Sequence, residues 1–432
     1  MGLFMENLIF KIENIIWSPA LLLLLLITHI YFTIKLKFPQ KYVGKGLKYM
    51  FFSDKKNDKQ GISSFKSLMT ILAGTLGTGN IVGIATAISI GGIGSIFWIF
   101  VSGILAIATK YAETYIVLKY RKKRYGKYLG GAMYVLDQRI DNRFLAVLFS
   151  FFVIIASFGM GCMVQSNAMS TSIIDTFNIS KYIVAAVVTA ICAFVIFGDE
   201  RTVSDVSSIL VPLATIIYIY ICAFSLIVYR NNILNGISNI IKEAFDFKAV
   251  AGGVSGSLAI KALNQGLSKG IFSNEAGLGS SPMFDCNVKE QNIQKQSIIS
   301  STSVFIDTVA LCTLTGIVIA SSQKYSVSMS SMDIIFNVFK VIPYGKFLVI
   351  FCLSAFAIAT IPCWAYYGKV AINYLFNFRK TYELLYKFFY VICIFVGATS
   401  SLESIWSLSN SANALMAIPN IYMIIYLRNE IK

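Results

Sequence analysis

Two glycine-rich segments carry polar side chains in apolar surroundings, and they are where this sequence could do chemistry. The first holds Gly74, Gly77 and Gly79 directly before Asn80, and the second is a run of glycines from 252 to 279 that contains Ser273-Asn274-Glu275. A glycine inside a helix costs about 1 kcal/mol relative to alanine. Backbone N–H groups released from a helix bind anions, and released carbonyls bind cations. The chemistry indicated is reversible ion binding.

Close helix packing through small residues is the alternative explanation for these glycines. It accounts for Gly79 and Gly83, which have the spacing of a helix-contact motif. It does not account for Asn80, Asn274 and Glu275, because polar groups in an apolar environment are expensive without partners. We therefore favour an unwound stretch in each segment.

Enzymatic and structural-metal chemistry find no support in the sequence. It contains neither H-E-x-x-H nor G-x-S-x-G, and no C-x-x-C pair links any of its 8 cysteines. The only histidine, His29, lies in an apolar stretch and is better explained as structural than as a ligand. We expect no enzyme activity, no cofactor and no metal beyond a transported cation.

The elements that must position these segments are membrane-spanning helices. Charged residues make up 13% of the chain, about half the fraction of a soluble domain, and the apolar runs are long and continuous. Eleven spans are expected. They lie near 17–36, 66–92, 93–118, 144–173, 182–198, 206–229, 249–282, 298–320, 347–375, 387–401 and 404–427.

The two glycine-rich spans occupy corresponding places once the first span is set aside. They are the first and the sixth of the remaining ten, so each opens a group of five. Five is odd, so the two groups cross the membrane in opposite orientations, as in transporters built on inverted repeats. This predicts three parts: an N-terminal helix and linker (1–65), a first five-helix repeat (66–229) and a second (230–432).

The net charge of +16 reports topology and gives no reason to expect nucleic-acid binding. With the N-terminus outside and the C-terminus cytoplasmic, most Lys and Arg fall on the cytoplasmic side. The clusters are Lys35 to Lys66, Arg121 to Lys127, and Arg379-Lys380. This predicts a multi-pass protein of the cell membrane whose basic side faces the anionic inner leaflet.

The same residues resemble the alanine/glycine:cation symporter family, also called the sodium:alanine symporters. The motifs that carry the resemblance run through most of the chain. They are Gly77-Thr78-Gly79-Asn80-Ile81 with Gly83, Lys110-Tyr111-Ala112-Glu113, Gly130-Gly131 with Met133-Tyr134, Gln165, Gly270 with Phe272 to Gly277, Gly279-Ser280, Phe305 to Thr308, Trp364 with Tyr366 to Gly368, and Asn413 with Leu415 to Asn420. The resemblance implies an all-α, leucine-transporter-type fold of one extra helix before a five-plus-five inverted repeat.

The resemblance also implies a zwitterionic substrate held between the first, third, sixth and eighth core helices. Thr78, Gly79 and Asn80 would meet its carboxylate, and Phe272, Ser273 and Asn274 its amino group. Gln165 would add a polar contact, and Trp364 would close the pocket over the side chain.

A sodium site between the first and eighth core helices is implied as well, to which we assign Gly77 and Thr360. Ala359 stands where the family usually has serine, and Asn410 where it usually has aspartate. Fewer oxygen ligands weaken a site for a hard cation, so proton coupling through Glu275 or Glu113 stays open.

The remaining buried charges have structural interpretations. Lys110 and Glu113 share a helix face and are expected to form an ion pair. Asp307 is expected to support the loosened backbone of the first or sixth core helix. Glu275 is expected either to satisfy N–H groups of the first core helix or to hold a proton.

The function expected is cation-coupled symport, with Na⁺ or H⁺, of a small neutral amino acid such as alanine or glycine into the cell. An amino-acid-sensing receptor that keeps the pocket without transport is the alternative. The sequence does not decide between alanine, glycine and glutamine, and it leaves the stereoselectivity and the oligomeric state open.

Overall fold

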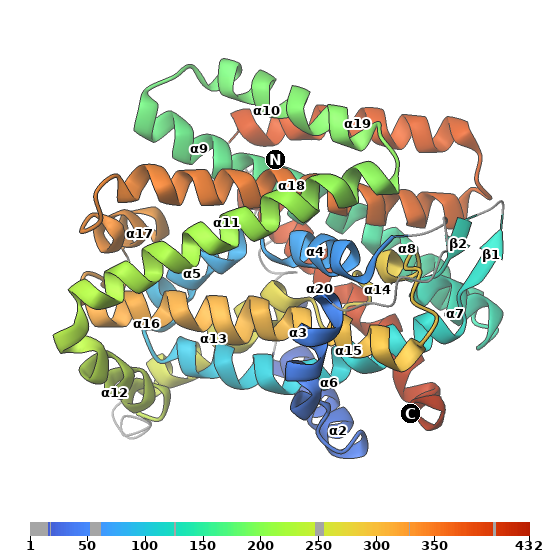
Figure 1. Ribbon diagram of the computed structural model, residues 1–432, viewed down its shortest axis with the longest axis horizontal. Coiled ribbons are helices and arrows are strands. Elements are labelled where there is room, and N and C mark those ends of the chain that lie inside the picture. Colours follow the sequence, from blue (N-terminus) through green and yellow to red (C-terminus); the bar gives the residue numbers. More distant parts are fainter. Residues whose placement is uncertain are drawn as a thin grey trace.

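The computed structural model describes residues 16–17, 19–51, 62–124, 127–246, 255–327, 329–400 and 403–432. Most of these residues are helical, and the strands form one short hairpin, β1 (Lys122–Arg124) and β2 (Lys127–Leu129), which pairs Lys122 with Leu129. Most of the long helices run side by side along the horizontal axis of Figure 1. The hairpin and the C-terminus lie at one end of this bundle.

The N-terminal part of the bundle contains the first predicted break. The helices before it are α2 (Pro19–Lys35) and α3 (Val43–Phe51), which meet at a bend of 67° between Ala20–Lys35 and Pro39–Phe51. The helices around the break are α4 (Ser64–Thr75), α5 (Val82–Gly91) and α6 (Ser95–Lys119). After the hairpin come α7 (Ala132–Gln138), α8 (Arg143–Phe158), α9 (Gln165–Phe177), α10 (Lys181–Ile196) and α11 (Glu200–Val228).

The C-terminal part contains the second predicted break. Its helices are α12 (Ile233–Ala244), α13 (Ser255–Asn274), α14 (Pro282–Asp285), α15 (Ile293–Val304), α16 (Thr313–Ser322), α17 (Ser331–Phe339), α18 (Gly345–Leu375), α19 (Lys380–Thr399) and α20 (Glu403–Tyr426). A π-helical turn, Gly159–Val164, joins α8 to α9, and a second, Phe305–Cys312, joins α15 to α16.

Six of the described helical stretches are long and apolar enough to cross a membrane, which confirms a helical, multi-pass architecture. Each runs a few residues past the range expected from hydropathy at one or both ends. For example, α11 begins at Glu200 instead of 206, because Asp199 caps it by accepting from the N–H groups of Arg201 and Thr202. Part of the span expected at 249–282 lies outside the described residues.

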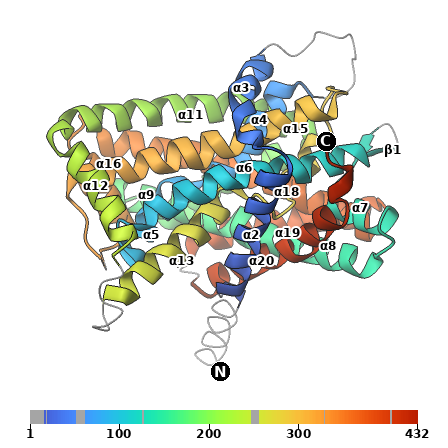
Figure 2. The same ribbon diagram turned by 90° about the horizontal axis from the view of Figure 1, so that it is seen from below.

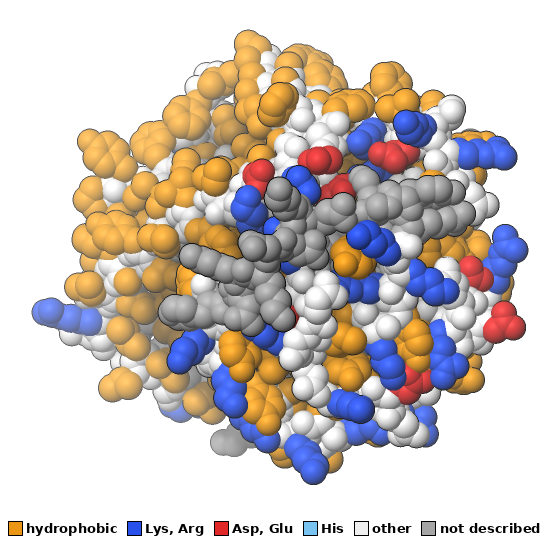
Figure 3. Space-filling view, turned by 45° about the vertical axis from the view of Figure 1, so that its right-hand side comes forward, with side chains coloured by type: hydrophobic (Ala, Val, Ile, Leu, Met, Phe, Trp, Pro, Cys, Tyr) orange, Lys and Arg blue, Asp and Glu red, His pale blue; other side chains and the backbone are white. Residues whose placement is uncertain are grey.

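The surface of the bundle is apolar in a way that suits lipid. Large hydrophobic side chains are widely exposed, with Phe194 and Leu234 each at 81%. A water-soluble protein rarely exposes such broad apolar surface. Figure 3 shows this apolar flank beside the end that carries the hairpin, where Lys and Arg side chains gather with some Asp and Glu. The side surface of the bundle is therefore apolar, and the end that carries the hairpin is basic.

A cluster at the basic end ties the C-terminal residues to α6 and α7. Glu430 accepts hydrogen bonds from Lys119 at 2.6 Å, from Arg139 at 2.9 Å and from the Tyr120 hydroxyl. Partial burial acts to raise the pKa of Glu430, but these hydrogen bonds outweigh it and lower the pKa from 4.5 to about 2. The folded state therefore favours the ionised carboxylate.

Replacing Glu430 with Gln should lower thermal stability at pH 7 slightly, by about 1 kcal/mol or less, because the cluster is partly exposed. A depressed folded-state pKa gives stability that is present above pH 4.5 and is lost as the pH falls towards 2. Melting curves in detergent should therefore show the difference between wild type and Glu430→Gln shrinking as the pH falls from 5 towards 2. Asp175→Asn, at an exposed carboxylate, is the control; a difference as large at pH 2 as at pH 7 would contradict the assignment.

Candidate functional site

The first helix break lies where the glycine spacing predicts it. The α4 helix ends at Thr75, a single 3-10 turn covers Thr78–Asn80, and α5 begins at Val82. Gly77 has an extended backbone and lies against Gln165, whose Oε1 would be 2.8 Å from any Cβ added there. A side chain at Gly77 would push Gln165 away, so the glycine permits the close approach of α9 to the break.

The second break lies where α13 ends, at Asn274. The chain turns through left-handed backbone conformations at Glu275 (φ 53°), Gly277 (φ 89°) and Gly279 (φ 76°) before α14 begins at Pro282. Two of these three positions are glycine, the residue that adopts this conformation without steric cost. Both predicted breaks are thus confirmed, although Gly252 and Gly253 lie outside the described residues.

The two breaks face each other in the interior of the bundle. The Asn80 amide donates to Ser273 Oγ at 3.2 Å, and a Cβ added at Gly79 would lie 3.5 Å from the Phe272 ring. Thr78, Asn80 and Ser273 are each at most 2% exposed. Five of the residues expected to bind substrate therefore lie together: Thr78, Gly79, Asn80, Phe272 and Ser273.

Asp307 joins these two breaks through side chains. It comes from the π-helical turn Phe305–Cys312 and accepts hydrogen bonds from the Asn80 amide and from Ser273 Oγ at 2.8 Å. The sequence led us to expect contact with loosened backbone, so the prediction was right about the location and wrong about the partners. The Asn80 amide nitrogen therefore donates to Asp307 and Ser273. The Asn80 amide oxygen, Oδ1, is buried and has no hydrogen-bond partner among the described residues.

Gln165 and Trp364 also reach the first break. Gln165 Oε1 accepts from the Thr78 backbone N–H at 3.0 Å and from the Thr78 hydroxyl at 3.1 Å. Trp364 Nε1 donates to the Gly74 carbonyl at 3.2 Å, and its side chain packs on Gly161, where an added Cβ would lie 2.2 Å from it. The π-helical turn Gly159–Val164 thus places Gly161 against the Trp364 side chain.

Thr360 lies beside the end of α4, as the expected cation site requires. Its hydroxyl donates to the Ala73 carbonyl at 2.7 Å and to the Phe356 carbonyl at 2.8 Å. Gly77, the other residue assigned to the cation, donates its N–H to the Thr75 carbonyl at 2.9 Å. The neighbouring Ala359 adds no side-chain oxygen, so the described cluster offers one hydroxyl and two carbonyls.

The second break is held by an ion pair on α6. Lys110 Nζ lies 3.5 Å from Glu113 Oε1, and both side chains are fully buried, which confirms the expected ion pair. Glu113 Oε2 also accepts from the N–H groups of Gly277 (3.0 Å) and Gly279 (3.2 Å) and from Asn420 Nδ2 (2.9 Å). The ion pair could be predicted from the sequence but this capping role could not, because the capped N–H groups are more than 160 residues away along the chain.

Asn274 and Glu275 complete the second break from within. The Asn274 side chain donates to the Gly270 carbonyl at 2.7 Å and accepts from the Ala276 N–H at 2.9 Å, so it bridges the end of α13. Lys110 donates to the Asn274 carbonyl at 3.3 Å. Glu275 Oε2 accepts from Ser280 instead of from the first break, and its buried Oε1 has no hydrogen-bond partner among the described residues. The expected contact of Glu275 with N–H groups of the first break is therefore wrong.

Removing Glu113 should be strongly destabilising. The Glu113→Ala change leaves the Lys110 ammonium and two backbone N–H groups buried without their acceptor, which costs about 3–5 kcal/mol. Thermal melts in detergent should show a large decrease in the melting temperature of Glu113→Ala. The control Asp205→Ala breaks a half-exposed pair with Lys66 and should change stability by less than about 1 kcal/mol. Equal effects of the two changes would refute the capping role.

Comparison with known proteins supplies the context for this geometry. Residues 2–432 match the model of the sodium:alanine symporter family. The chain is 35% identical over 433 residues to the sodium/alanine symporter AgcS of Methanococcus maripaludis, covering 96% of this chain and 93% of the relative. It is 29% identical over 431 residues to the probable sodium/glutamine symporter GlnT of Bacillus subtilis, covering 98% and 88%.

Among solved structures, the chain resembles MhsT in complex with L-phenylalanine, with a TM-score of 0.64 and 13% identity over 86% of this chain and 90% of that one. At this identity the likeness shows the fold alone, which is that of leucine-transporter-type proteins. The family and the relatives are transporters and not enzymes. With the family model matched from residue 2 to residue 432, this chain belongs to the sodium:alanine symporter family.

Proposed function

We propose that this protein carries a small neutral amino acid, alanine or glycine, across the cell membrane together with Na⁺. One observation carries the proposal: the first helix break holds both hydrogen-bond donors and a buried acceptor, and the second break packs against it. The donors are the Thr78 N–H and hydroxyl, and the acceptor is Asn80 Oδ1, which has no hydrogen-bond partner among the described residues. A zwitterion can leave water only where both its charges find partners.

The carboxylate of the amino acid would bind at Thr78 and Gly79. Gln165 Oε1 accepts from Thr78 in the structure, and a carboxylate oxygen is the same kind of acceptor with a full charge. We propose that the substrate takes over these hydrogen bonds and that the Gln165 amide then donates to it. The N-terminal end of α5 follows directly and favours negative charge.

The amino group would bind on the opposite side, near Ser273 and the Asn80 oxygen. Asn80 is thus proposed to meet the cationic part of the site, because its amide nitrogen is already used by Asp307. We propose that Asn274 acts by shaping the break, since its side chain bonds both to Gly270 and to Ala276. Phe272 and Trp364 would enclose the substrate side chain.

The preference for a small side chain follows from the packing around these rings. The Phe272 ring lies close to Gly79, and Trp364 is fully buried against Gly161. An interior packed this closely has little free volume, and each added methylene requires neighbours to move. Alanine and glycine fit this constraint better than glutamine, the substrate in the name of one relative.

Na⁺ is the coupling ion we propose, held by the Thr360 hydroxyl and the Ala73 carbonyl, with Gly77 four residues after Ala73 in the chain. The family and the AgcS relative are both named for sodium. Proton coupling is the alternative, and Glu275 is its best carrier, because one of its buried oxygens lacks a hydrogen-bond partner among the described residues. Glu113 already accepts from three donors and is less suited.

The organisation of the chain enters the proposal as well. We propose an N-terminal helix and linker (1–65) followed by two inverted five-helix repeats (66–229 and 230–432), giving eleven spans. The two breaks, in the first helix of each repeat, support this division. We place the basic end and the C-terminus in the cytoplasm and the N-terminus outside. Neither the family nor the relatives support the sensing alternative.

Reconstituted protein should take up labelled alanine when a sodium gradient is imposed, and excess glycine should compete more strongly than glutamine. Asn80→Ala should reduce uptake at least tenfold, because it removes both the unpaired oxygen and the donor to Asp307. Asn337→Ala, at an exposed asparagine, is the matched control. Folded wild-type protein that accumulates no alanine under either a sodium or a proton gradient would refute the proposal.

Replacing Thr360 with Val should raise the sodium concentration for half-maximal uptake about tenfold, because it removes the one hydroxyl of the proposed site, and tenfold corresponds to about 1.4 kcal/mol. Thr28→Val is the control, since that buried hydroxyl donates only to its own helix, at Leu24. Sodium titrations of initial uptake rates measure both. An unchanged sodium dependence combined with uptake driven by a pH gradient would favour protons instead.

A further inference from the structure

A cavity lies at the basic end, away from the two breaks. It encloses about 610 Å³ between the last turns of α18, the starts of α11 and α19, the hairpin and α7, and the segment after α14. Its walls include Glu200, Lys369, Lys380 and Glu383, and its floor includes Asn287 and Tyr366. We call this cavity the vestibule.

Charges of both signs line the vestibule and form ion pairs in or beside it. Lys369 Nζ lies 3.8 Å from Glu200 Oε2, and the side chains are 13% and 18% exposed. Glu383 lies 3.5 Å from Lys387 and receives a 3.4 Å hydrogen bond from Asn373. The Lys369 and Glu200 side chains are therefore largely shielded from bulk water.

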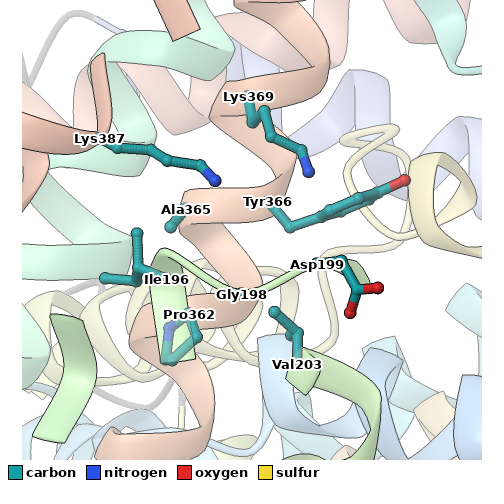
Figure 4. A pocket seen from close by; sticks show the side chains of 9 residues that line it. All are labelled: Ile196, Gly198, Asp199, Val203, Pro362, Ala365, Tyr366, Lys369 and Lys387. Carbon is teal, nitrogen blue, oxygen red and sulfur yellow. The ribbon is translucent and has the colours of Figure 1, made fainter. Parts of the chain in front are cut away.

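The floor of the vestibule lies on the same helix as Trp364, a residue of the proposed substrate site. Asn287 Nδ2 donates to the Tyr366 hydroxyl at 2.6 Å, and both residues are less than 9% exposed. Tyr366 lies two residues after Trp364 on α18, about 3 Å along the helix axis. In Figure 4, Lys369 and Tyr366 extend from the same stretch of α18, and the Lys369 ammonium lies over the Tyr366 ring, 5.1 Å from its centre.

We propose that the vestibule is a second binding site, of lower affinity, for the zwitterionic amino acid on the cytoplasmic side of the central site. The substrate carboxylate binds Lys369, and the substrate ammonium binds Glu200. The zwitterion replaces the Lys369–Glu200 pair charge for charge, so no buried charge is left without a partner. This site rests on the proposed function and adds a step to it, between the central site and the cytoplasm.

The physical benefit lies in removing water from the substrate in stages. A free zwitterion entering the protein interior must lose its hydration at both ends, and burial of unpaired charge is costly. A cavity with fixed charges of both signs supplies partners that replace this hydration before the substrate moves to the central site. Because these groups lie on one side of the membrane, their loss should affect substrate arriving from that side only.

The test compares substrate entry from the two faces. Initial rates of sodium-dependent alanine transport are measured against alanine concentration in right-side-out and inside-out membrane vesicles. The double change Lys369→Met with Glu200→Gln removes both charges together. We expect the half-saturating alanine concentration to rise about tenfold from the cytoplasmic face and to stay within twofold from the other face. Lys340→Met, which lines a different cavity, is the control.

Two outcomes separate this inference from the proposed function. Wild-type vesicles that show no saturable alanine transport would overturn the proposed function and this site with it. Wild-type transport with an unchanged cytoplasmic half-saturation in the double variant, or an equal rise from both faces, would overturn the vestibule site alone. If the double variant does not fold, Glu200→Gln alone should give a smaller rise on the cytoplasmic face, and no rise would overturn the site.

Discussion

The structure depends on one constraint: backbone polar groups in a membrane interior must have partners within the protein. Both helix breaks violate the regular helical pattern that normally meets this constraint. Side chains from neighbouring helices compensate at each one. Gln165 accepts from Thr78 at the first break, and Glu113 accepts from Gly277 and Gly279 at the second. The positions of α6, α9 and α18 around the breaks follow from this requirement.

The same compensation is what makes a ligand site physically reasonable. A partner that satisfies a backbone N–H with a neutral amide oxygen can be displaced by a carboxylate, which is a stronger acceptor. Gln165 is such a partner, whereas Glu113 is charged, held by three donors and paired with Lys110. The first break is thus suited to exchange partners, and the second is suited to stay fixed. This asymmetry supports the proposal that ligand exchange occurs at the break between α4 and α5, while the break between α13 and α14 stays rigid.

Sequence alone located the breaks because their cause is local. Glycine spacing and isolated polar residues such as Asn80 and Glu275 mark them directly. The ion pair between Lys110 and Glu113 was equally predictable, because it lies within one helix. The capping of Gly277 by Glu113, the orientation of the Asn80 amide and the vestibule were not, since each joins segments distant in the sequence. The π-helical turns carry no simple composition signal, although Gly161 marks one of them afterwards.

The central claim is that backbone groups at the first break take part in binding the proposed amino-acid substrate. Amide hydrogen exchange, read by mass spectrometry on reconstituted protein with and without alanine and Na⁺, tests it most directly. The account predicts that peptides covering 76–82 exchange more slowly with both ligands present, while peptides from α10 and α19 do not change. Slowed exchange elsewhere, with 76–82 unaffected under conditions where alanine is transported, would contradict it.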